Sequence, residues 1–491
     1  MNLETICAKV MEGGAVGESE VKFESLSMEE IRIKSESDRF AKVVLKALEA
    51  NGDNECDLYL HQYRALYALA EGKDVLLISP CGSGKTRVLN NAPVVAKLGY
   101  ELCSEVESEV NPLGIVCCPL TSIMEDKLKD TQNAGMISMY GRGTLSEKNK
   151  EDLSNAENEF LSDKLSYIYG HPESFATEIG RKILESNEDR IYVFVCDEVG
   201  YNVWGPDFRI LMSSVPGSIR VFSSSNAPML CMSATIGKAD QVKVKEDLGM
   251  VHRKCEVIDF NPVMPNIFLA KLRRPSNQKG FYEPSGLKDI LCGLFLNEFI
   301  SDPLNSRKAI IFCKNELDLI QVYEFLEHEI GKQFTNMKSR PWVQYHGSTG
   351  ERTLSWIHHR LKCDDDLEVK LLISTYKIVM GVDLKDLDLA IFIRYNFSSQ
   401  LFRLIIPLLV RPPNTIPCLV QGLGRVGRSL PFGSRKAAGV ILYNDEDIKP
   451  NAPGMTQEMR DLLTTSACLK NKLADSFGYS FTHTADWCCS N

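Results

Sequence analysis

The 491-residue sequence lacks any apolar run long enough to cross a membrane. A membrane-spanning helix needs about 20 consecutive apolar residues, whereas the longest candidate, Leu401–Val410, is short and contains Arg403. The first residues also lack a basic segment followed by an apolar core, so we expect no secretory signal. The sequence therefore predicts a protein for which no membrane is a partner.

Dense cysteine spacing and an excess of positive charge are absent as well. The 16 cysteines are scattered along the chain, which is typical of a reducing, intracellular compartment and excludes a disulfide scaffold. Lysine and arginine number 56 against 65 aspartates and glutamates, a formal charge of −9. A chain of this charge does not coat nucleic acid by bulk attraction, so any such binding would need a local basic groove.

What the sequence does contain is an alternation of short apolar runs and polar segments of helical length. Runs rich in valine, isoleucine and leucine are typical of parallel strands that are buried on both faces. Their alternation with helical segments predicts an α/β fold. The runs are Val75–Ile78, Ile115–Cys118, Tyr192–Cys196, Ile310–Cys313, Leu371–Ser374, Ala390–Ile393 and Val440–Tyr443.

The length and one break in this pattern divide the chain. At about 150 residues per domain, 491 residues suggest about three units. Asparagine and proline interrupt the alternation at 259–265, which we interpret as a linker, and one helix is expected over Met28–Leu48. The other predicted parts are a helical or flexible N-terminal extension (1–55), two stacked α/β lobes (56–258 and 266–447) and a short C-terminal piece (448–491).

The first lobe begins with a candidate phosphate-binding loop. The run Val75–Ile78 leads into a glycine-bearing loop and then a helix, an order in which backbone N–H groups and a lysine can hold phosphate oxygens and a threonine hydroxyl can ligate Mg²⁺. The strict pattern has glycine where this sequence has Ser79, so a chance glycine turn remains the alternative. The candidate residues are Gly82, Ser83, Gly84, Lys85 and Thr86.

Two acidic residues, Asp197 and Glu198, follow the apolar run Tyr192–Cys196. A carboxylate at the end of a strand can hold the Mg²⁺ shell while its neighbour orients the attacking water. Two acids after a strand also occur as a solvated turn. Together with Lys85 and Thr86, the pair predicts a site of nucleotide hydrolysis.

Two arginines close the second lobe. Arg425 and Arg428 stand beside glycines in the segment Gln421–Arg428, and their spacing places both on one side of a short helix or turn. They could reach the γ-phosphate of a nucleotide that is bound to the other lobe, as an arginine finger within one chain. The alternative is a basic surface turn. If the first interpretation holds, hydrolysis requires the lobes to close.

Several further motifs occur in a fixed order along the chain. Gln62 stands upstream of Lys85, and the segments that follow it are Gly72–Val75, Cys118–Asp126, His171–Glu173, Trp204–Arg209, Ser233–Thr235, Phe260–Ile267, Tyr345–His346 and Met380–Asp383. Over residues 58–491 this series resembles the RecQ helicases of helicase superfamily two.

The resemblance implies two RecA-like P-loop lobes and an ATP-dependent helicase that moves 3′ to 5′ on DNA, single-stranded or forked, with ATP and Mg²⁺ as cofactors. Gln62 would read adenine, Gln421 would contact the nucleotide, and Glu198 would activate water. Arg425 and Arg428 would stabilise the charge of the transition state. In a eukaryotic host the resemblance implies a nuclear protein, and otherwise a cytoplasmic one.

The loop after the acid pair has its own physical interpretation. Trp204 and Phe208 beside Arg209 offer a stacking surface and a cation, so an unstacked base bound there could influence the ATP site. The alternative is two core aromatics and a surface ion pair. For the basic stretch at 271–274 we favour solvated surface over phosphate contact.

Some positions depart from the family pattern. Gly200 stands where the family has a histidine that helps couple hydrolysis to strand movement, and Lys377, Val379 and Ser429 also differ. An insertion spans about 395–410. Gly200 and Val379 leave open a nucleic-acid-binding regulator that does not unwind. An RNA helicase is a separate alternative, which the Trp204–Arg209 loop disfavours.

Three cysteines in the C-terminal piece resemble part of the RecQ zinc-binding subdomain. Cys468, Cys488 and Cys489 could supply soft thiolate ligands, and four thiolates would close a tetrahedral zinc site. The family's next cysteine would be expected beyond Asn491. Lone buried cysteines are the alternative.

Overall fold

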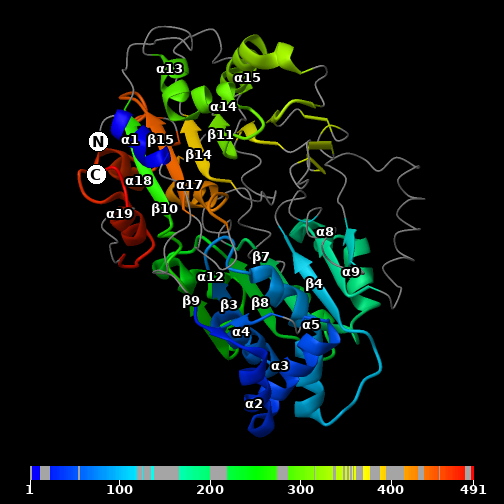
Figure 1. Cartoon of the computed structure of the whole chain (residues 1–491). Helices are drawn as coiled ribbons and strands as arrows, with labels where there is room; N and C mark the ends of the chain where they lie inside the picture. Colours follow the sequence, from blue (N-terminus) through cyan, green and yellow to red (C-terminus); the bar gives the residue numbers. More distant parts are fainter. Residues whose placement is uncertain are drawn as a thin grey trace. The chain divides into compact units, whose positions relative to one another are not determined.

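The computed structural model of the chain divides into two units (Figure 1). The first unit is Phe23–Pro262, and the second unit is Met1–Lys22 together with Val263–Asn491. The described residues are 3–11, 23–53, 56–118, 124, 134–137, 165–199, 218–273, 286–313, 316–334, 339–346, 349–350, 353, 356–357, 359–360, 369–375, 387–393, 414–428, 436–452, 454–481 and 488–491.

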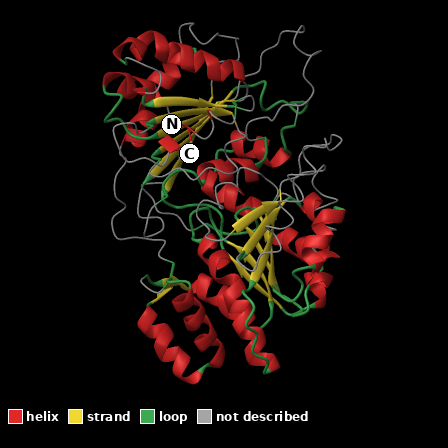
Figure 2. Cartoon of the chain, turned by 90° about the vertical axis from the view of Figure 1, so that its right-hand side faces the viewer, coloured by secondary structure: helices red, strands yellow, loops and turns green. Residues whose placement is uncertain are grey.

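The first unit is built on a seven-stranded sheet of order β5-β6-β4-β7-β8-β3-β9 in which every pairing is parallel. Helices cover the sheet on both faces (Figure 2). The strands are β3 (Asp74–Ile78), β4 (Leu113–Cys117), β5 (Ala134–Ile137), β6 (Tyr167–Gly170), β7 (Ile191–Asp197), β8 (Met229–Ser233) and β9 (Cys255–Asp259). The α-helices described in this unit are α2 (Met28–Ser37), α3 (Arg39–Ala50), α4 (Leu60–Ala70), α5 (Lys85–Ser104), α8 (Pro172–Ala176), α9 (Glu178–Glu185) and α12 (Gln241–Asp247). A small antiparallel pair, β1 (Ser25–Leu26) with β2 (Leu58–Tyr59), and the 3-10 turns η1 (Arg220–Phe222), η2 (Lys238–Asp240) and η3 (Met250–His252) complete the unit.

Side-chain alternation along β3 shows how the sheet separates two hydrophobic cores. Val75 and Leu77 belong to the core under α3, α4 and α5, whereas Leu76 and Ile78 belong to the core under α9 and α12. Successive residues of a strand point to opposite faces, so a strand that is apolar throughout must be covered on both sides. The position of β3 inside the sheet follows from its four consecutive apolar residues.

The helix that we predicted over Met28–Leu48 is two helices. Asp38 ends α2 and begins α3, because its carboxylate accepts hydrogen bonds from the backbone N–H groups of Phe40 and Ala41. A carboxylate at this position satisfies N–H groups that have no partner inside the new helix. The prediction of one continuous helix is therefore wrong at Asp38.

The second unit contains a six-stranded sheet of order β10-β15-β14-β11-β13-β12, also parallel throughout. Its strands are β10 (Ile267–Arg273), β11 (Ala309–Cys313), β12 (Trp342–Tyr345), β13 (Leu371–Thr375), β14 (Leu389–Ile393) and β15 (Ala437–Tyr443). Its helices are α1 (Leu3–Met11), α13 (Leu287–Leu291), α14 (Asn297–Ser301), α15 (Glu316–Ile330), α17 (Ile416–Leu423), α18 (Gln457–Thr464) and α19 (Leu469–Ser476), with the π turn η4 (Cys292–Leu296) and the 3-10 turn η5 (Gly331–Gln333). Ile6 and Val10 of α1 are buried in this unit's core.

The predicted α/β class with two parallel-sheet, RecA-like lobes is confirmed, and each of the seven apolar runs coincides with a strand, except that Cys118 lies one residue beyond the end of β4. The chain passes from the first unit to the second between Pro262 and Val263, inside the expected linker. The expected extension 1–55 is shared, because α1 packs in the second unit while α2 and α3 pack in the first. The C-terminal residues join the second unit, where Cys489 bridges to Leu269 of β10. Within the described residues, no helix has the length and apolarity that a membrane span requires.

Candidate active site

The loop between β3 and α5 has the backbone geometry of a phosphate cradle. Gly82 and Gly84 have φ angles of 80° and 83°, in the left-handed region that favours glycine. A Cβ atom on residue 84 would also lie 2.2 Å from Nε2 of Gln62, so no other residue fits there without displacing that side chain. The loop leads directly into the N-terminus of α5, a 20-residue helix whose first N–H groups attract anions.

The loop is held together by its own polar groups. The ammonium of Lys85 donates to the carbonyl oxygens of Ser79 and Pro80 at 2.7 and 3.0 Å. The hydroxyls of Ser79 and Ser83 share a hydrogen bond of 2.8 Å and are buried. The departure at Ser79 therefore has a structural explanation, since its side chain closes the loop from inside.

Gln62 connects the first turn of α4 to this loop. Its Oε1 accepts from the backbone N–H of Tyr59 at 2.9 Å, and its Nε2 donates to the carbonyl of Gly84 at 3.0 Å. The side chain is buried. The structure thus gives Gln62 a supporting role for the loop, and the adenine contact remains a prediction.

His61 is a neighbour of the loop that the motifs did not identify. Its Nε2 lies 3.0 Å from the carbonyl oxygen of Ser83, so this nitrogen carries the hydrogen that is donated. Its ring packs among those of Phe23, Tyr59 and Phe260 at centroid distances of 4.6 to 5.6 Å. The pKa of His61 is lowered to about 4, mainly by burial and also by the nearby Lys85 cation, while the hydrogen bond to Ser83 opposes the shift. His61 is therefore neutral at neutral pH.

The acid pair stands at the carboxyl end of β7. Asp197 is buried as the last residue of the strand, and the backbone N–H of Glu198 donates to its Oδ1 at 3.1 Å. Glu198 has a φ of 53°, which is uncommon for a residue with a long side chain. The next residue fixes this turn, because the N–H of Val199 donates to the carbonyl of Met232 on β8 at 3.2 Å.

The segment Ser233–Thr235 lies between the acid pair and the phosphate-binding loop. Strand β8 is paired with β7 on one side and β3 on the other, and the N–H of Ser79 donates to the carbonyl of Ser233 at 3.1 Å. The Ser233 hydroxyl accepts from the N–H of Thr235. Two strand spacings of about 4.8 Å separate β3 from β7, so the acids and the loop occupy one edge of the sheet. A nucleotide phosphate bound on the loop would lie within reach of both Asp197 and Glu198.

The loop that precedes Gln62 is held by Arg87, which is about 30 residues further along the chain. Arg87, in the first turn of α5, donates from Nε to both carboxylate oxygens of Asp53 at 3.0 and 2.9 Å and also binds the carbonyls of Cys56 and Asp57. Asn91 donates to the same carboxylate. Sequence reasoning missed Arg87 and Asp53, because nothing in the spacing marks them as partners.

The predicted catalytic arginines lie in the second unit, on the turn after α17. Arg425 and Arg428 are both half-buried, and Gln421 is buried on the helix itself. The turn is ordered by one backbone and one side-chain hydrogen bond: the N–H of Gly427 donates to the carbonyl of Leu387 at 2.9 Å, and the side-chain Nε of Arg428 donates to the carbonyl of Gly424 at 2.8 Å. The structure therefore brings the two arginines together on one turn.

The basic stretch that begins at Lys271 is used in structural contacts. The ammonium of Lys271 binds the carbonyls of Leu462 and Thr465 at the end of α18, and Arg273 pairs with Asp445 at 2.7 Å. The Arg273 side chain is largely exposed. Arg273 agrees with the solvated surface that we favoured, whereas Lys271 is half-buried and holds α18 to β10.

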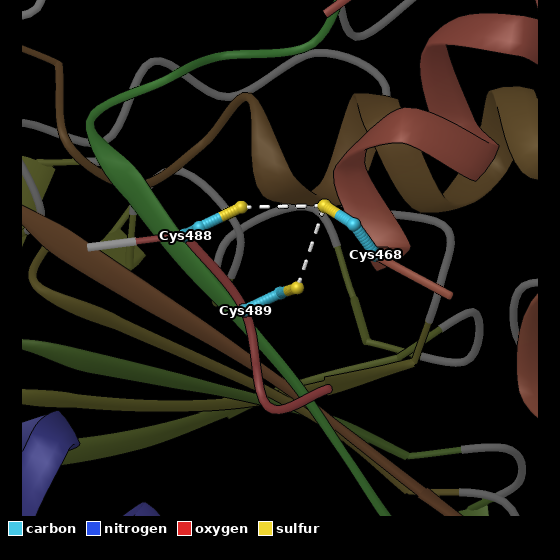
Figure 3. Close-up of side chains that lie close together, drawn as sticks. All are labelled: Cys468, Cys488 and Cys489. Carbon is cyan, nitrogen blue, oxygen red and sulfur yellow. Dashed lines mark hydrogen bonds between the residues drawn. The ribbon is translucent and has the colours of Figure 1, made fainter. Parts of the chain in front are cut away.

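The three predicted zinc ligands form one cluster (Figure 3). Cys468 precedes α19, while Cys488 and Cys489 lie on the tail beside β10, and their sulfurs are 3.4 and 3.6 Å from the Cys468 sulfur. Three sulfurs around one tetrahedral zinc, each at about 2.3 Å, are about 3.8 Å apart. The geometry of the cluster therefore fits three of the four ligands of a zinc site.

Other predictions concern residues outside the part of the chain that the structure describes. They include the three candidate nucleic-acid contacts Trp204, Phe208 and Arg209. They also include Arg274 of the basic stretch, the departures Gly200, Lys377, Val379 and Ser429, and the insertion 395–410.

Comparison with known proteins agrees with this geometry. Residues 59–242, which contain the loop and the acid pair, match the family described as DEAD/DEAH box helicase. Among solved structures, Mss116p bound to ssRNA and AMP-PNP has a TM-score of 0.60 at 15% identity, covering 88% of this chain and 77% of that one. The helicase MrfA bound to DNA and AMPPNP has a TM-score of 0.58 at 16% identity, covering 91% and 55%. Fold and family match thus define the class, a two-lobed α/β protein whose residues 59–242 match the DEAD/DEAH box helicase family.

The curated relatives are more specific. The chain is 23% identical over 429 residues to ATP-dependent DNA helicase Q1 of Pongo abelii, covering 84% of this chain and 59% of that protein. It is 26% identical over 375 residues to ATP-dependent helicase SGS1 of Saccharomyces cerevisiae, covering 75% and 22%. The predicted resemblance to the RecQ helicases is confirmed, and the chain spans about three fifths of the helicase Q1 relatives' length.

Proposed function

We propose that this protein is an ATP-dependent DNA helicase that couples ATP hydrolysis to 3′-to-5′ movement along a single strand and to unwinding of the duplex. The observation that carries the proposal is the shared sheet edge on which the Gly82–Lys85 loop and the Asp197–Glu198 pair lie, with Ser233 between them. The RecQ relatives support the choice of DNA, and the polarity comes from the resemblance alone.

In this proposal each residue has a stated role. Gly82, Ser83 and Gly84 offer backbone N–H groups to the phosphates, and Lys85 exchanges its loop carbonyl partners for phosphate oxygens. Thr86 and Asp197 would hold Mg²⁺, which neutralises phosphate charge when it is bound. Glu198 accepts a proton from the attacking water, and Gln62 and Gln421 contact the nucleotide. Arg425 and Arg428 stabilise the charge that develops on the transferring phosphate.

Replacement of Lys85 by alanine tests the site. We expect ATP hydrolysis stimulated by single-stranded DNA to fall by about 100-fold or more, because the transition state loses a fixed cation. Lys97→Ala is the matched control, since Lys97 lies on the same helix about three turns further along and forms an ion pair with Glu101. Unchanged turnover in the Lys85 variant would refute the assigned site.

Nucleic acid is expected to reach the site through Trp204, Phe208 and Arg209. Alanine at Trp204 should weaken the stimulation of ATP hydrolysis by DNA more than the basal rate, because stacking on that ring is worth about 1–3 kcal/mol per base. Competition between DNA and RNA strands for this stimulation distinguishes a DNA from an RNA helicase.

A second candidate is a strand-binding ATPase or regulator that does not separate duplexes. Gly200 favours it, because the family's histidine at that position links hydrolysis to strand movement. Measurements of ATP hydrolysis and forked-duplex unwinding on one preparation separate the two. Hydrolysis without unwinding would support the regulator.

We further propose that Cys468, Cys488 and Cys489 hold a zinc ion, which would attach the C-terminal tail to the edge of the second unit's sheet. Metal analysis of the purified protein should find about one zinc per chain, and Cys468→Ser should lose it. Cys103→Ser is the control because that thiol is exposed and remote from the cluster in sequence. Equal zinc content in all three proteins would contradict the assignment.

A further inference from the structure

A buried asparagine next to the linker holds the turn that carries the two arginines. Asn266 is 4% exposed, and its side-chain Nδ2 donates to the carbonyl oxygen of Gly427 at 3.0 Å. Gly427 stands between Arg425 and Arg428 in the sequence and has a φ of 66°. The hydrogen bond therefore fixes the orientation of a peptide unit in the middle of the arginine turn, 161 residues away along the chain.

The asparagine is itself held from two sides. The N–H of Ala437 on β15 donates to the Asn266 carbonyl at 3.1 Å. The ammonium of Lys470, a side chain that is 1% exposed, donates to the carbonyl of Pro265 at 2.7 Å. Asn266 also directly precedes β10. With its backbone fixed, the side chain can act as a rigid support and does not simply follow the turn.

The position of Asn266 in the chain connects the linker to the arginine turn. The chain enters the second unit at Val263, three residues before Asn266. A change in the path of the linker would therefore reach the arginine turn through one side-chain hydrogen bond. Chains of hydrogen-bonded groups can carry energetic coupling between distant sites, and Pro265, Asn266 and Gly427 form such a chain.

We propose that Asn266 is a positioning residue for ATP hydrolysis, which sets the direction in which Arg425 and Arg428 present their guanidinium groups to the transferring phosphate. The inference rests on the proposed function. Displacement of a catalytic group by about 1 Å can cost on the order of 100-fold in rate, and loss of a buried donor to a glycine carbonyl would permit such a displacement. Nucleotide binding to the first unit would be unaffected.

The test uses the full chain with Asn266→Asp and Asn266→Ala. Aspartate has nearly the same shape as asparagine, but its carboxylate cannot donate to the Gly427 carbonyl. Asn444→Ala is the control, because Asn444 is a buried asparagine of the same unit whose Oδ1 accepts from the Asp447 N–H, away from the arginine turn. We expect kcat to fall by about 10- to 100-fold in both Asn266 variants, with the KM for ATP changed by less than about threefold.

Two further readouts separate positioning from general destabilisation. Hydrogen exchange should become faster at Gly427 in the Asn266 variants but not in Asn444→Ala. In addition, Arg428→Ala should lower kcat by less than about twofold when it is added to Asn266→Asp, because both changes remove one effect. Full multiplication of the two single effects would overturn the inference, as would a wild-type kcat per folded molecule in Asn266→Asp.

The failure of the inference and that of the proposed function are distinguishable. If Arg428→Ala slows hydrolysis and Asn266→Asp does not, the positioning role is wrong and the proposed function stands. If the wild-type chain does not hydrolyse ATP, or if alanine at both arginines leaves kcat unchanged, the proposed function fails and the positioning role fails with it.

Discussion

At the scale of single residues, Glu198 combines the predicted catalytic carboxylate with an uncommon backbone conformation. Its φ of 53° places a long side chain in the left-handed region, at a cost of about 1–2 kcal/mol that asparagine largely avoids. Such conformations persist where the surrounding structure enforces them, and here the Val199 N–H is bound to Met232 on the neighbouring strand. The strain and the proposed water-activating role therefore fall on one residue.

Two substitutions separate these properties of Glu198. Both Glu198→Gln and Glu198→Asn should lower kcat by about 100-fold or more, because each removes the general base. Only the asparagine variant should also gain stability, by about 1 kcal/mol relative to the glutamine variant, because asparagine tolerates the left-handed region. Thermal unfolding of the two variants measures the difference, and equal melting temperatures would show that the strain is not relieved.

His61 makes the first unit sensitive to acid. Its folded pKa of about 4 lies below the ordinary value of 6.5, with burial as the main cause. The unfolded chain therefore binds a proton at a higher pH than the folded chain, so the stabilising contribution is complete above about pH 6.5 and declines as the pH falls toward 4, by up to about 3 kcal/mol.

The His61→Gln variant tests this dependence, because glutamine keeps an N–H that can donate to the Ser83 carbonyl and does not titrate. Melting temperatures should be measured from pH 7.5 to pH 5 for both proteins. The wild-type value should fall more steeply with acid than that of the variant. Parallel curves would mean that other groups dominate the acid response.

At the scale of helices and strands, the sequence predicts a strand reliably where both faces of that strand are buried. Strands such as β3 and β11 are covered on both faces, so they appear as unbroken apolar runs. Strand β9 lies at the sheet edge, where its half-buried positions admit the polar Glu256 and Asp259, and no apolar run marks it. The break at Asp38 is a capping effect, in which one carboxylate outweighs a continuous helical pattern.

The candidate site also has parts that the sequence predicts and parts that it does not. The loop from Gly82 to Lys85 and the acids are local motifs whose chemistry can be inferred from neighbouring letters. The supports of the arginine turn and of β3 come instead from far along the chain, as Asn266 does for Gly427 and Arg220 does for Asp74. Partners separated by more than 140 residues are fixed by topology, which a single sequence does not reveal.

The Asp74 cluster joins the amino ends of three strands. Both terminal guanidinium nitrogens of Arg220 donate to the fully buried carboxylate of Asp74 at 2.6 and 3.0 Å, and the N–H of Met229 on β8 donates to it at 2.9 Å. Arg253, which precedes β9, lies 3.5 Å away. One carboxylate thus ties β3 to its two neighbours, at the edge opposite the phosphate-binding loop.

Removal of this charge should destabilise the first unit. We expect Asp74→Asn to cost about 3–5 kcal/mol in the free energy of unfolding, because the Arg220 charge is left without its partner. Glu71→Gln is the control, since its ion pair with Lys73 is partly exposed and such pairs contribute about 0–1 kcal/mol. Urea denaturation measures both. A loss below about 1 kcal/mol in Asp74→Asn would show that the cluster is not a structural support.

At the scale of the whole molecule, the chain passes between its two units twice. It begins with α1 in the second unit, forms the whole first unit, and returns at Val263. The loop and the acids are in the first unit, whereas the arginines are in the second. In the proposed chemistry the first unit binds the nucleotide and the second unit supplies the arginines. The response of each unit to nucleotide can therefore be measured separately.

The identity of the nucleotide should decide which unit it stabilises. At about 100 times its dissociation constant, a ligand adds about 2.7 kcal/mol to the folded state that binds it, which raises the melting temperature of a unit this size by about 5–10 °C. MgADP should raise the melting temperature of the first unit more than that of the second, because it lacks the γ-phosphate that the arginines are proposed to contact and leaves Gln421 as the proposed contact of the second unit. A non-hydrolysable ATP analogue should raise both, and Arg425→Ala with Arg428→Ala should reduce only the shift of the second unit. Hydrogen exchange along the thermal ramp assigns each transition to its unit. If the analogue moves only the first transition in the wild-type chain, the second unit's arginines do not contact the nucleotide.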